Sequence, residues 1–223
     1  MSFQELVKLT QKKHRREMGL CIVEGEKLVR EHRDHAVAVF SRGAVGDNAT
    51  ALKPAEFDRV SNLETPEGVL AVVPIPKSTA ITYPYLVLDG VQDAGNVGTI
   101  LRTAKAFGFD TVFCVNCADP WSQKVLRSAM GAQFGLNVYE NFDYANVGGE
   151  LYIADMPNAT EKNTPLSARP KNKFGIVLGN EGHGVGAEIR ELPHKIVSIP
   201  QKKGVESLNV SVAGAIILYV WSQ

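Results

Sequence analysis

The chain has 223 residues, 24 basic and 24 acidic side chains, and a hydrophobic content of 44%. This composition is typical of a folded globular protein and excludes a disordered chain, which would be less apolar and more strongly charged. Three cysteines are too few for a disulfide framework, so we expect a reducing, cytoplasmic location. A signal-peptide pattern and an apolar run of about 20 residues are both missing, so we expect neither a secreted nor a membrane protein.

The N-terminal part combines charge-rich helical segments with short strands. The first 35 residues are helical in pattern and contain a basic run at 12–16. Apolar, β-branched runs between turn residues predict strands at 20–23, 36–40 and 69–73. Prolines that follow the last of these runs indicate a linker. We therefore expect three parts, which are a small α+β domain over 1–76, a linker over 77–83 and a second domain over 84–223.

The second domain alternates strands with helices. The predicted strands are 85–88, 111–115, 151–154, 174–178 and 196–199, and the predicted helices are 96–107, 121–130 and 208–220. Such alternation predicts an α/β domain, with a parallel sheet covered by helices on both faces. The last helix is apolar nearly all round, which predicts burial in a core or a subunit interface. Ligands of parallel sheets bind where strands end, so the segments after the strands are the candidate sites.

The first of these segments runs from Asp89 to Gly98 and continues into a helix that carries Arg102. Gly98 and Arg102 are four residues apart and share one helix face. A glycine beneath a long cation leaves room for a ligand, and the free N–H groups at the helix start attract anions. A solvated arginine after ordinary turn glycines has the same pattern, so the spacing alone leaves both interpretations open.

Two later segments also follow strands. In the second segment, 174–186, four glycines in eight positions indicate either a backbone that another group approaches closely or a loose turn. Glu181 in this segment could bind a ligand or act as the acid at a helix start. In the third segment, 199–211, Ser207 is predicted to cap the last helix. Asn209, two positions later, is less easily explained by capping.

Together the three segments resemble the signature motifs of the SpoU–TrmH family, the RNA ribose 2′-O-methyltransferases of the SPOUT class. The residues that carry the resemblance are Asn96, Gly98 and Arg102, then Leu178-Gly179-Asn180-Glu181-Gly182, and finally Ile199-Pro200 with Ser207-Leu208-Asn209-Val210-Ser211. The resemblance covers about residues 84–223. Residues 13–25 are similar to the small RNA-substrate-binding domain that precedes the catalytic domain in many members.

The resemblance implies a sheet threaded into a trefoil knot, S-adenosylmethionine as cofactor, and a homodimer. It also implies that Arg102 is the principal catalytic residue. A guanidinium stays protonated, so its expected role is to hold an RNA phosphate and stabilise the developing alkoxide. The implied catalytic residues are Arg102, Asn96, Glu181, Ser207 and Asn209. The implied cofactor-binding residues are Leu178, Gly179, Asn180, Gly182, Ile199, Gln201 and Leu208.

RNA is the expected partner. The residues of the basic run that we expect to bind RNA phosphates are Lys12, Lys13, Arg15 and Arg16, although a solvated helix end has the same pattern. We expect rRNA as the substrate, because the N-terminal part resembles that of rRNA-modifying members more than the short arms of tRNA-modifying ones. The alternatives are a tRNA substrate and a non-catalytic RNA-binding protein that keeps the fold.

Three other patterns do not indicate a site. Cys114 and Cys117 have the spacing of a redox or half-zinc motif, but without a second pair we expect ordinary core and loop thiols. The five histidines show no metal-binding spacing, so no metal is expected. Residues 182–187 fit a dinucleotide-binding glycine pattern. The next strand ends without an acidic residue for a ribose, however, which argues against an oxidoreductase.

Overall fold

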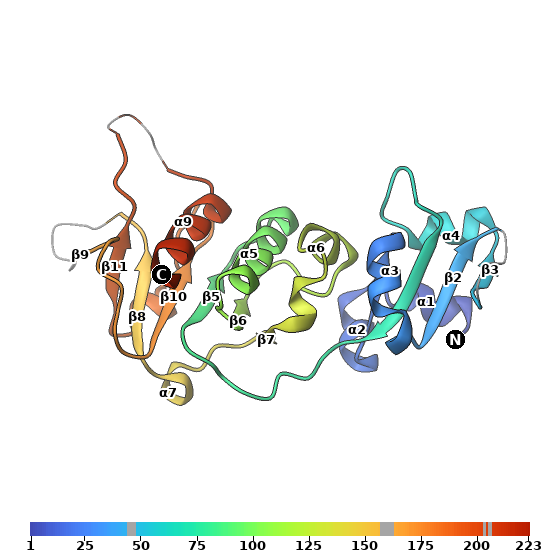
Figure 1. Cartoon of the computed structure of the whole chain (residues 1–223), viewed down its shortest axis with the longest axis horizontal. Coiled ribbons are helices and arrows are strands. Elements are labelled where there is room, and N and C mark those ends of the chain that lie inside the picture. The colour runs from blue at the N-terminus through green and yellow to red at the C-terminus, as the bar shows by residue number, and fades with distance from the viewer. Residues whose placement is uncertain (44–47, 157–162, 203, 205–206) are drawn as a thin grey trace.

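The computed structural model describes residues 1–43, 48–156, 163–202, 204 and 207–223. Figure 1 shows an elongated molecule with two lobes, each built around its own sheet. Within the described residues, every helix is too short or too polar to cross a membrane.

The smaller lobe has a four-stranded sheet of order β1-β4-β2-β3. Its elements are α1 (Phe3–Lys8), α2 (Lys12–Met18), β1 (Leu20–Glu24), α3 (Glu26–His32), η1 (Arg33–His35), β2 (Ala38–Arg42), β3 (Thr50–Leu52), α4 (Pro54–Val60) and β4 (Val69–Pro74). The predicted α+β class and its three strands are confirmed. β3 and α4 were missed, because β3 has only three residues and α4 buries only Phe57 and Val60.

The larger lobe has a seven-stranded sheet of order β7-β6-β5-β10-β8-β11-β9, and every pairing in it is parallel, as predicted. Its strands are β5 (Tyr85–Asp89), β6 (Thr111–Val115), β7 (Asn137–Tyr139), β8 (Glu150–Ala154), β9 (Asn163–Pro165), β10 (Phe174–Leu178) and β11 (Lys195–Ser198). Its helices are α5 (Ala94–Ala106), α6 (Gln123–Ser128), η2 (Ala132–Gly135), α7 (Tyr144–Val147), α8 (Ala187–Arg190) and α9 (Val210–Ser222). The sequence did not predict β7 and β9, the two edge strands, which have three residues each.

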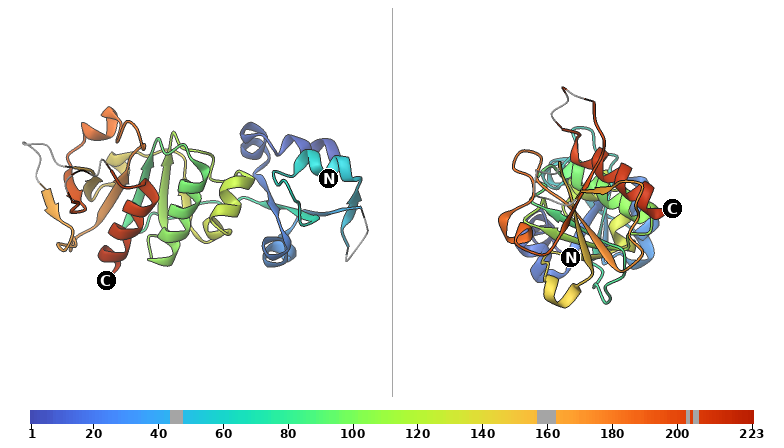
Figure 2. Two further views of the ribbon diagram at one scale, coloured as in Figure 1. Left: turned by 90° about the horizontal axis from the view of Figure 1, so that it is seen from above. Right: turned by 90° about the vertical axis from the view of Figure 1, so that its left-hand side faces the viewer.

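Both faces of this sheet are buried, which explains why its strands are continuous apolar runs. Leu86 and Leu88 of β5 face the core under α5, α6 and α9, while Val87 faces the core under α7 and α8. Figure 2 shows α9 beside α5. Trp221 of α9 is fully buried and donates a hydrogen bond from Nε1 to the Leu166 carbonyl at 2.8 Å. The prediction of a buried last helix is therefore confirmed. Strand order alone does not establish the trefoil knot, which stays a prediction.

The two lobes share an interface built on α6. Trp121 and Leu126 pack in one apolar cluster with residues of β1, α3 and β4. Gln123, only 6% exposed, donates from Nε2 to the Val60 carbonyl at 3.1 Å and accepts at Oε1 from Nδ2 of Asn62 at 2.8 Å. The predicted linker, 77–83, contains no helix or strand. The relative position of the lobes therefore depends on this interface as well as on the linker.

Candidate active site

A cavity of about 240 Å³ lies where β8, β10 and β11 end, against the start of α9. Six of the seven predicted cofactor-binding residues line it, namely Leu178, Gly179, Asn180, Ile199, Gln201 and Leu208. Two of the predicted catalytic residues, Glu181 and Ser207, line it as well. Gly182 is not part of the described lining. Segments that lie far apart in the sequence thus form one cavity at the carboxyl edge of the sheet, as expected for a parallel sheet.

Other lining residues were missed by the sequence analysis. They are Ala154, Asp155 and Met156 at the end of β8 and just after it, Gly184 and Val197, and Val210, Ala213 and Ile217 on α9. β8 was predicted as a strand, so its position beside β10 was the available signal, but no motif follows it. Asp155 accepts a hydrogen bond from Nη2 of Arg190 on α8, which places an ion pair at the cavity wall.

Asn180 organises the loop that borders the cavity. Its Oδ1 accepts hydrogen bonds from the backbone N–H groups of Gly182 and His183, at 2.9 and 3.0 Å. Its Nδ2 donates to the Gly90 carbonyl at 2.8 Å, which ties this loop to the segment after β5. Two backbone hydrogen bonds of 2.9 Å between Asn180 and Gly184 close the loop. The side chain is therefore engaged within the protein, and it shapes the cavity by holding the loop.

The protein's own backbone leaves no room for a side chain at Gly179. A Cβ atom at this position would lie 2.5 Å from the carbonyl carbon of Gly184 and from the nitrogen of Val185. Such distances are far inside van der Waals contact, so any larger residue would push the loop away from β10. The glycine pattern was interpreted as a close approach by a ligand or as a loose turn. At Gly179 the group that approaches is the protein backbone.

Three of the predicted catalytic residues form one hydrogen-bonded chain. Asn96, in the first turn of α5, donates from Nδ2 to Oε1 of Glu181 at 2.8 Å. Asn209 donates from Nδ2 to Oδ1 of Asn96 at 3.1 Å. The chain thus connects the segments that follow β5, β10 and β11. Because Glu181 also lines the cavity, these side chains lie at its border.

The cap of α9 differs from the prediction. Asn209, not Ser207, is the N-cap, and its Oδ1 accepts from the backbone N–H groups of Ser211 and Val212 at 2.9 and 3.3 Å. Asparagine is among the best N-cap residues, because its oxygen satisfies N–H groups that have no partner within the helix. Ser207 is exposed and is thereby left as a polar group in the cavity lining.

Arg102 lies on α5 beyond Asn96, and its side chain is exposed. It does not line the cavity, and it forms no hydrogen bond or ion pair with any residue that the structure describes. Gly98, which shares its helix face, packs against α6, where a Cβ atom would lie 2.5 Å from Cβ of Ser128. The guanidinium is therefore available to an external anion.

The basic run lies largely at the contact between the lobes. Arg15 is 6% exposed and donates from Nε to Oδ2 of Asp119 at 3.0 Å and from Nη1 to the Leu9 carbonyl at 2.7 Å. Lys12 and Arg16 both pair with Glu140. Arg15 thus has a structural position in place of the predicted RNA contact, because a buried, paired cation is not accessible to a phosphate. Lys13 is exposed beside Glu17, and its RNA role stays a prediction.

The three cysteines are free thiols. Burial raises the pKa of Cys117 to about 11 and that of Cys114 well above its usual range. Cys117 donates weak hydrogen bonds to the carbonyls of Leu88 and Val115, both at 3.2 Å. These surroundings favour the neutral thiol over the reactive thiolate. The interpretation of both cysteines as core and loop thiols is confirmed.

Comparison with family models matches both lobes. Residues 83–219 match the SpoU rRNA Methylase family, and residues 2–71 match the MRM3-like substrate binding domain. The chain is 33% identical over 235 residues to the 23S rRNA (guanosine(2553)-2′-O)-methyltransferase RlmP of Bacillus subtilis, covering 95% of this chain and 92% of that protein. It is 31% identical to the mitochondrial rRNA methyltransferase 3A of Danio rerio, covering 71% of this chain and 50% of that protein.

Solved structures share the whole fold. A TrmH-family protein from Porphyromonas gingivalis superposes with a TM-score of 0.80 at 30% identity, covering 98% of this chain and 96% of that one. The AdoMet-bound rRNA methyltransferase of Sinorhizobium meliloti gives a TM-score of 0.81 at 23% identity, covering 98% of this chain and 93% of that one. Because its identity is only 23%, the similarity to the Sinorhizobium meliloti structure supports the fold alone.

Proposed function

This chain belongs to the SpoU rRNA methylase family, and we propose that it transfers a methyl group from S-adenosylmethionine to a ribose 2′-hydroxyl of ribosomal RNA. The observation that carries the proposal is the hydrogen-bonded chain of Asn209, Asn96 and Glu181 at the border of the cavity. It unites all three family motifs at one point. A fold kept only for binding RNA would have no need to retain one residue of each motif in this contact.

The cavity fits S-adenosylmethionine. Oε1 of Gln201 is buried and has no hydrogen-bond partner in the described part of the chain, which is costly unless a ligand donates to it. Apolar side chains such as Leu178 and Ile217 line the cavity, and Glu181, which forms no ion pair with a described residue, supplies a carboxylate that suits a cationic ligand. When bound, S-adenosylmethionine supplies a methyl group on a sulfonium, an electrophile that needs no further activation.

The protein must therefore position the ribose hydroxyl and assist the loss of its proton. We assign Arg102 to hold an RNA phosphate beside the reacting ribose and to stabilise the alkoxide that develops, with the phosphate as the proton acceptor. The exposed, unpaired state of Arg102 among the described residues supports this role. Asn96, Glu181 and Asn209 orient the site, and Ser207 offers a hydroxyl at the cavity. These roles belong to the proposal.

The first experiment is the transfer of labelled methyl from S-adenosylmethionine to rRNA and to tRNA in parallel, followed by separation of ribose-methylated from base-methylated nucleosides. Label on a 2′-O-methyl nucleoside from rRNA is expected. Label on tRNA alone would establish the alternative substrate class. Intact binding of rRNA without transfer or cofactor binding would establish the non-catalytic alternative. Arg102→Ala is the negative control for transfer.

We further propose that the protein acts as a homodimer in the cytoplasm. α9 supports the dimer, because Val212 and Tyr219 remain 48% and 55% exposed although the helix is apolar nearly all round. Exposed apolar side chains on a helix that also builds the cavity suit a symmetric contact. Sedimentation equilibrium is expected to give twice the chain mass, and Tyr219→Lys is expected to shift the protein toward monomer.

A further inference from the structure

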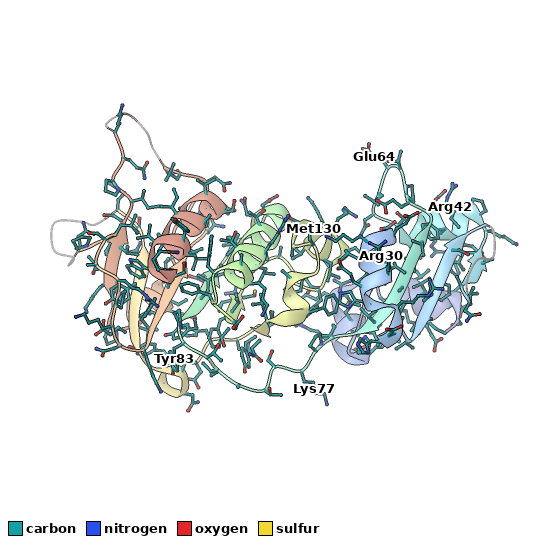
Figure 3. All side chains as sticks on the ribbon, in the orientation of Figure 1. Arg30, Arg42, Glu64, Lys77, Tyr83 and Met130 are labelled. Atoms are coloured by element: carbon teal, nitrogen blue, oxygen red, sulfur yellow. The ribbon has the colours of Figure 1, made fainter. Side chains whose placement is uncertain are left out.

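A second hollow, of about 600 Å³, lies at the amino edge of the seven-stranded sheet. It is lined by residues 83–84, just before β5, and 169–174, which lead into and begin β10. The first cavity lies at the carboxyl ends of the strands, so the two hollows are separated by the length of a strand, about 17 Å for five residues. Figure 3 shows Tyr83 at this edge, below β5 and β10 and away from the start of α9.

The lining of this hollow is strongly basic. Arg169, Lys171 and Lys173 all contribute to it, and none of the described lining residues is acidic. All three side chains are exposed. Lys171 has no hydrogen-bond or ion-pair partner among the described residues, and Arg169 donates only to the backbone oxygen of Gln223, at 2.7 Å. Within the described part of the chain no carboxylate pairs with Lys171 or Lys173, so the hollow concentrates positive charge from these two lysines.

Glu150, which lies beside this hollow, does not neutralise its charge. Glu150 accepts hydrogen bonds from Tyr152 and from Nζ of Lys195, the latter at 3.1 Å. These contacts lower its pKa, so Glu150 is ionised and its charge is balanced by Lys195. Asn172, between the lining lysines, lies 3.5 Å from the same carboxylate. The local balance therefore remains positive.

Backbone hydrogen bonding and Tyr83 hold Lys173, one of the three cations, in place. The Lys173 carbonyl accepts from the backbone N–H of Glu150 at 2.9 Å, and Gly149 allows this approach because a Cβ there would lie 2.9 Å from the same carbonyl oxygen. Tyr83 is held by a hydrogen bond from its hydroxyl to the Val147 carbonyl. Nζ of Lys173 lies 4.8 Å from the centre of the Tyr83 ring. Tyr83 therefore supports Lys173, which lies over one face of its ring, and its hydroxyl is engaged within the protein.

We propose that this basic hollow binds the phosphate backbone of the rRNA substrate, away from the ribose that is methylated. The inference rests on the proposed function and extends it with a second contact. A polyanion can engage several exposed cations at once and gains from the release of counterions. Because the exposed charged groups of the lining are the cations Arg169, Lys171 and Lys173, the contact depends on charge and not on base identity, so it adds affinity without sequence preference.

The test uses the full chain and an unmodified 23S rRNA transcript as the probe. The triple variant Arg169→Ala, Lys171→Ala, Lys173→Ala is compared with a charge-matched control, Lys77→Ala, Lys105→Ala, Lys124→Ala, whose residues are exposed, dispersed and outside both the hollow and the substrate-binding domain match. We expect the first variant to bind the transcript about tenfold or more weakly at 0.1 M salt. The slope of log K against log salt concentration should fall by the amount that corresponds to about two to three lost phosphate contacts. Its affinity for S-adenosylmethionine and its thermal midpoint should match those of the wild type.

Equal weakening of RNA binding in both triple variants would overturn the proposal, because net charge and not this hollow would then be responsible. A hollow for free phosphate is distinguished by adding inorganic phosphate at constant ionic strength. We expect 10 mM phosphate to leave RNA binding unchanged. Phosphate binding that is lost in the variant, with RNA affinity intact, would overturn the RNA assignment. Methyl transfer by the wild type, measured in parallel, reports on the proposed function independently.

Discussion

Asn96 and Glu181 are 85 residues apart in the sequence, and Nδ2 of Asn96 donates to Oε1 of Glu181 at 2.8 Å. The cap of α9 determines the orientation of the Asn96 side-chain amide. Oδ1 of Asn209 accepts from backbone N–H groups, so its Nδ2 must face Asn96. Asn96 must then present its oxygen to Asn209 and its nitrogen to Glu181. The helix cap and the site are thus parts of one hydrogen-bonded unit.

Asn96→Asp is expected to lower kcat/KM about ten- to hundredfold, because a carboxylate would face Glu181 and the donated hydrogen bond would be lost. Steady-state methyl transfer to rRNA measures the effect. Asn146→Asp is the matched control, since Asn146 donates to Asp143 at 2.6 Å on the remote helix α7. Unchanged activity in both variants would show that the Asn96 contact does not matter for the reaction.

Arg102→Ala is expected to reduce kcat to near background while the affinity for S-adenosylmethionine changes by no more than a few fold, because Arg102 does not line the cavity. Arg102→Lys should recover only part of the activity, since lysine keeps the charge but lacks the planar fork of donors. Lys105→Ala, on the same helix, is the control. Calorimetry of cofactor binding alongside the kinetics decides the matter, and a parallel loss of both would give Arg102 a supporting role in the cavity.

Gly98→Ala should destabilise the protein through overpacking. The new Cβ would lie 2.5 Å from Cβ of Ser128 and 2.9 Å from the backbone nitrogen of Ala129, so α5 and α6 must separate. The expected cost is about 1–3 kcal/mol, or a few degrees in the thermal midpoint. Thr99→Ala, at an exposed neighbouring position, should leave the midpoint unchanged. Adding Ser128→Gly should restore only part of the loss, because the contact with backbone remains.

Arg15→Met is expected to lower the free energy of unfolding by about 3–5 kcal/mol, because it leaves the Asp119 carboxylate, whose side chain is only 10% exposed, without its partner. Urea unfolding measures the change. Lys13→Met, two residues away at an exposed position, should have little effect. Adding Asp119→Asn to Arg15→Met should recover part of the stability, since the asparagine keeps an acceptor for the backbone N–H of Trp121 without the charge. A small effect of Arg15→Met alone would show that the lobe interface tolerates an unpaired Asp119.

Stability should fall as pH rises through the alkaline range. Burial raises the pKa of Cys21 to about 12 and that of Cys117 to about 11, whereas the unfolded thiols titrate near their usual values. At a pH below the thiol pKa of the unfolded chain, the thiols are protonated in both the folded and the unfolded state. The free energy of unfolding is then not reduced by thiol ionisation. Stability is lost as pH rises toward the thiol pKa of the folded protein, because in that range only the thiols of the unfolded chain ionise.

Urea unfolding between pH 7 and 10.5 measures this trend, and Cys117→Ala should flatten it. At pH 8 the native thiols should react with iodoacetamide much more slowly than those of the urea-unfolded chain. Equal rates in the two states would show that the cysteines are accessible as thiolates, contrary to their buried positions.

The sequence by itself determined the class of fold and the nature of the site. Apolar runs such as 174–178 predicted the buried parallel strands, because both faces of such a strand must be apolar. The spacing of Asn96, Glu181 and Asn209 within family motifs predicted that they act together. These features depend on local periodicity and on short motifs, which can be identified in the sequence without knowledge of long-range contacts.

Only the tertiary structure decided which side chains meet. Asn209 caps α9 in place of Ser207, because the helix starts two residues later than its apolar pattern indicated. Arg15 is buried against Asp119, 104 residues away, although its neighbours in the sequence indicated an exposed basic run. Asp155 joins the cavity because β8 lies beside β10 and β11. Strand order and lobe packing bring distant residues together, and a one-dimensional pattern contains no record of those long-range contacts.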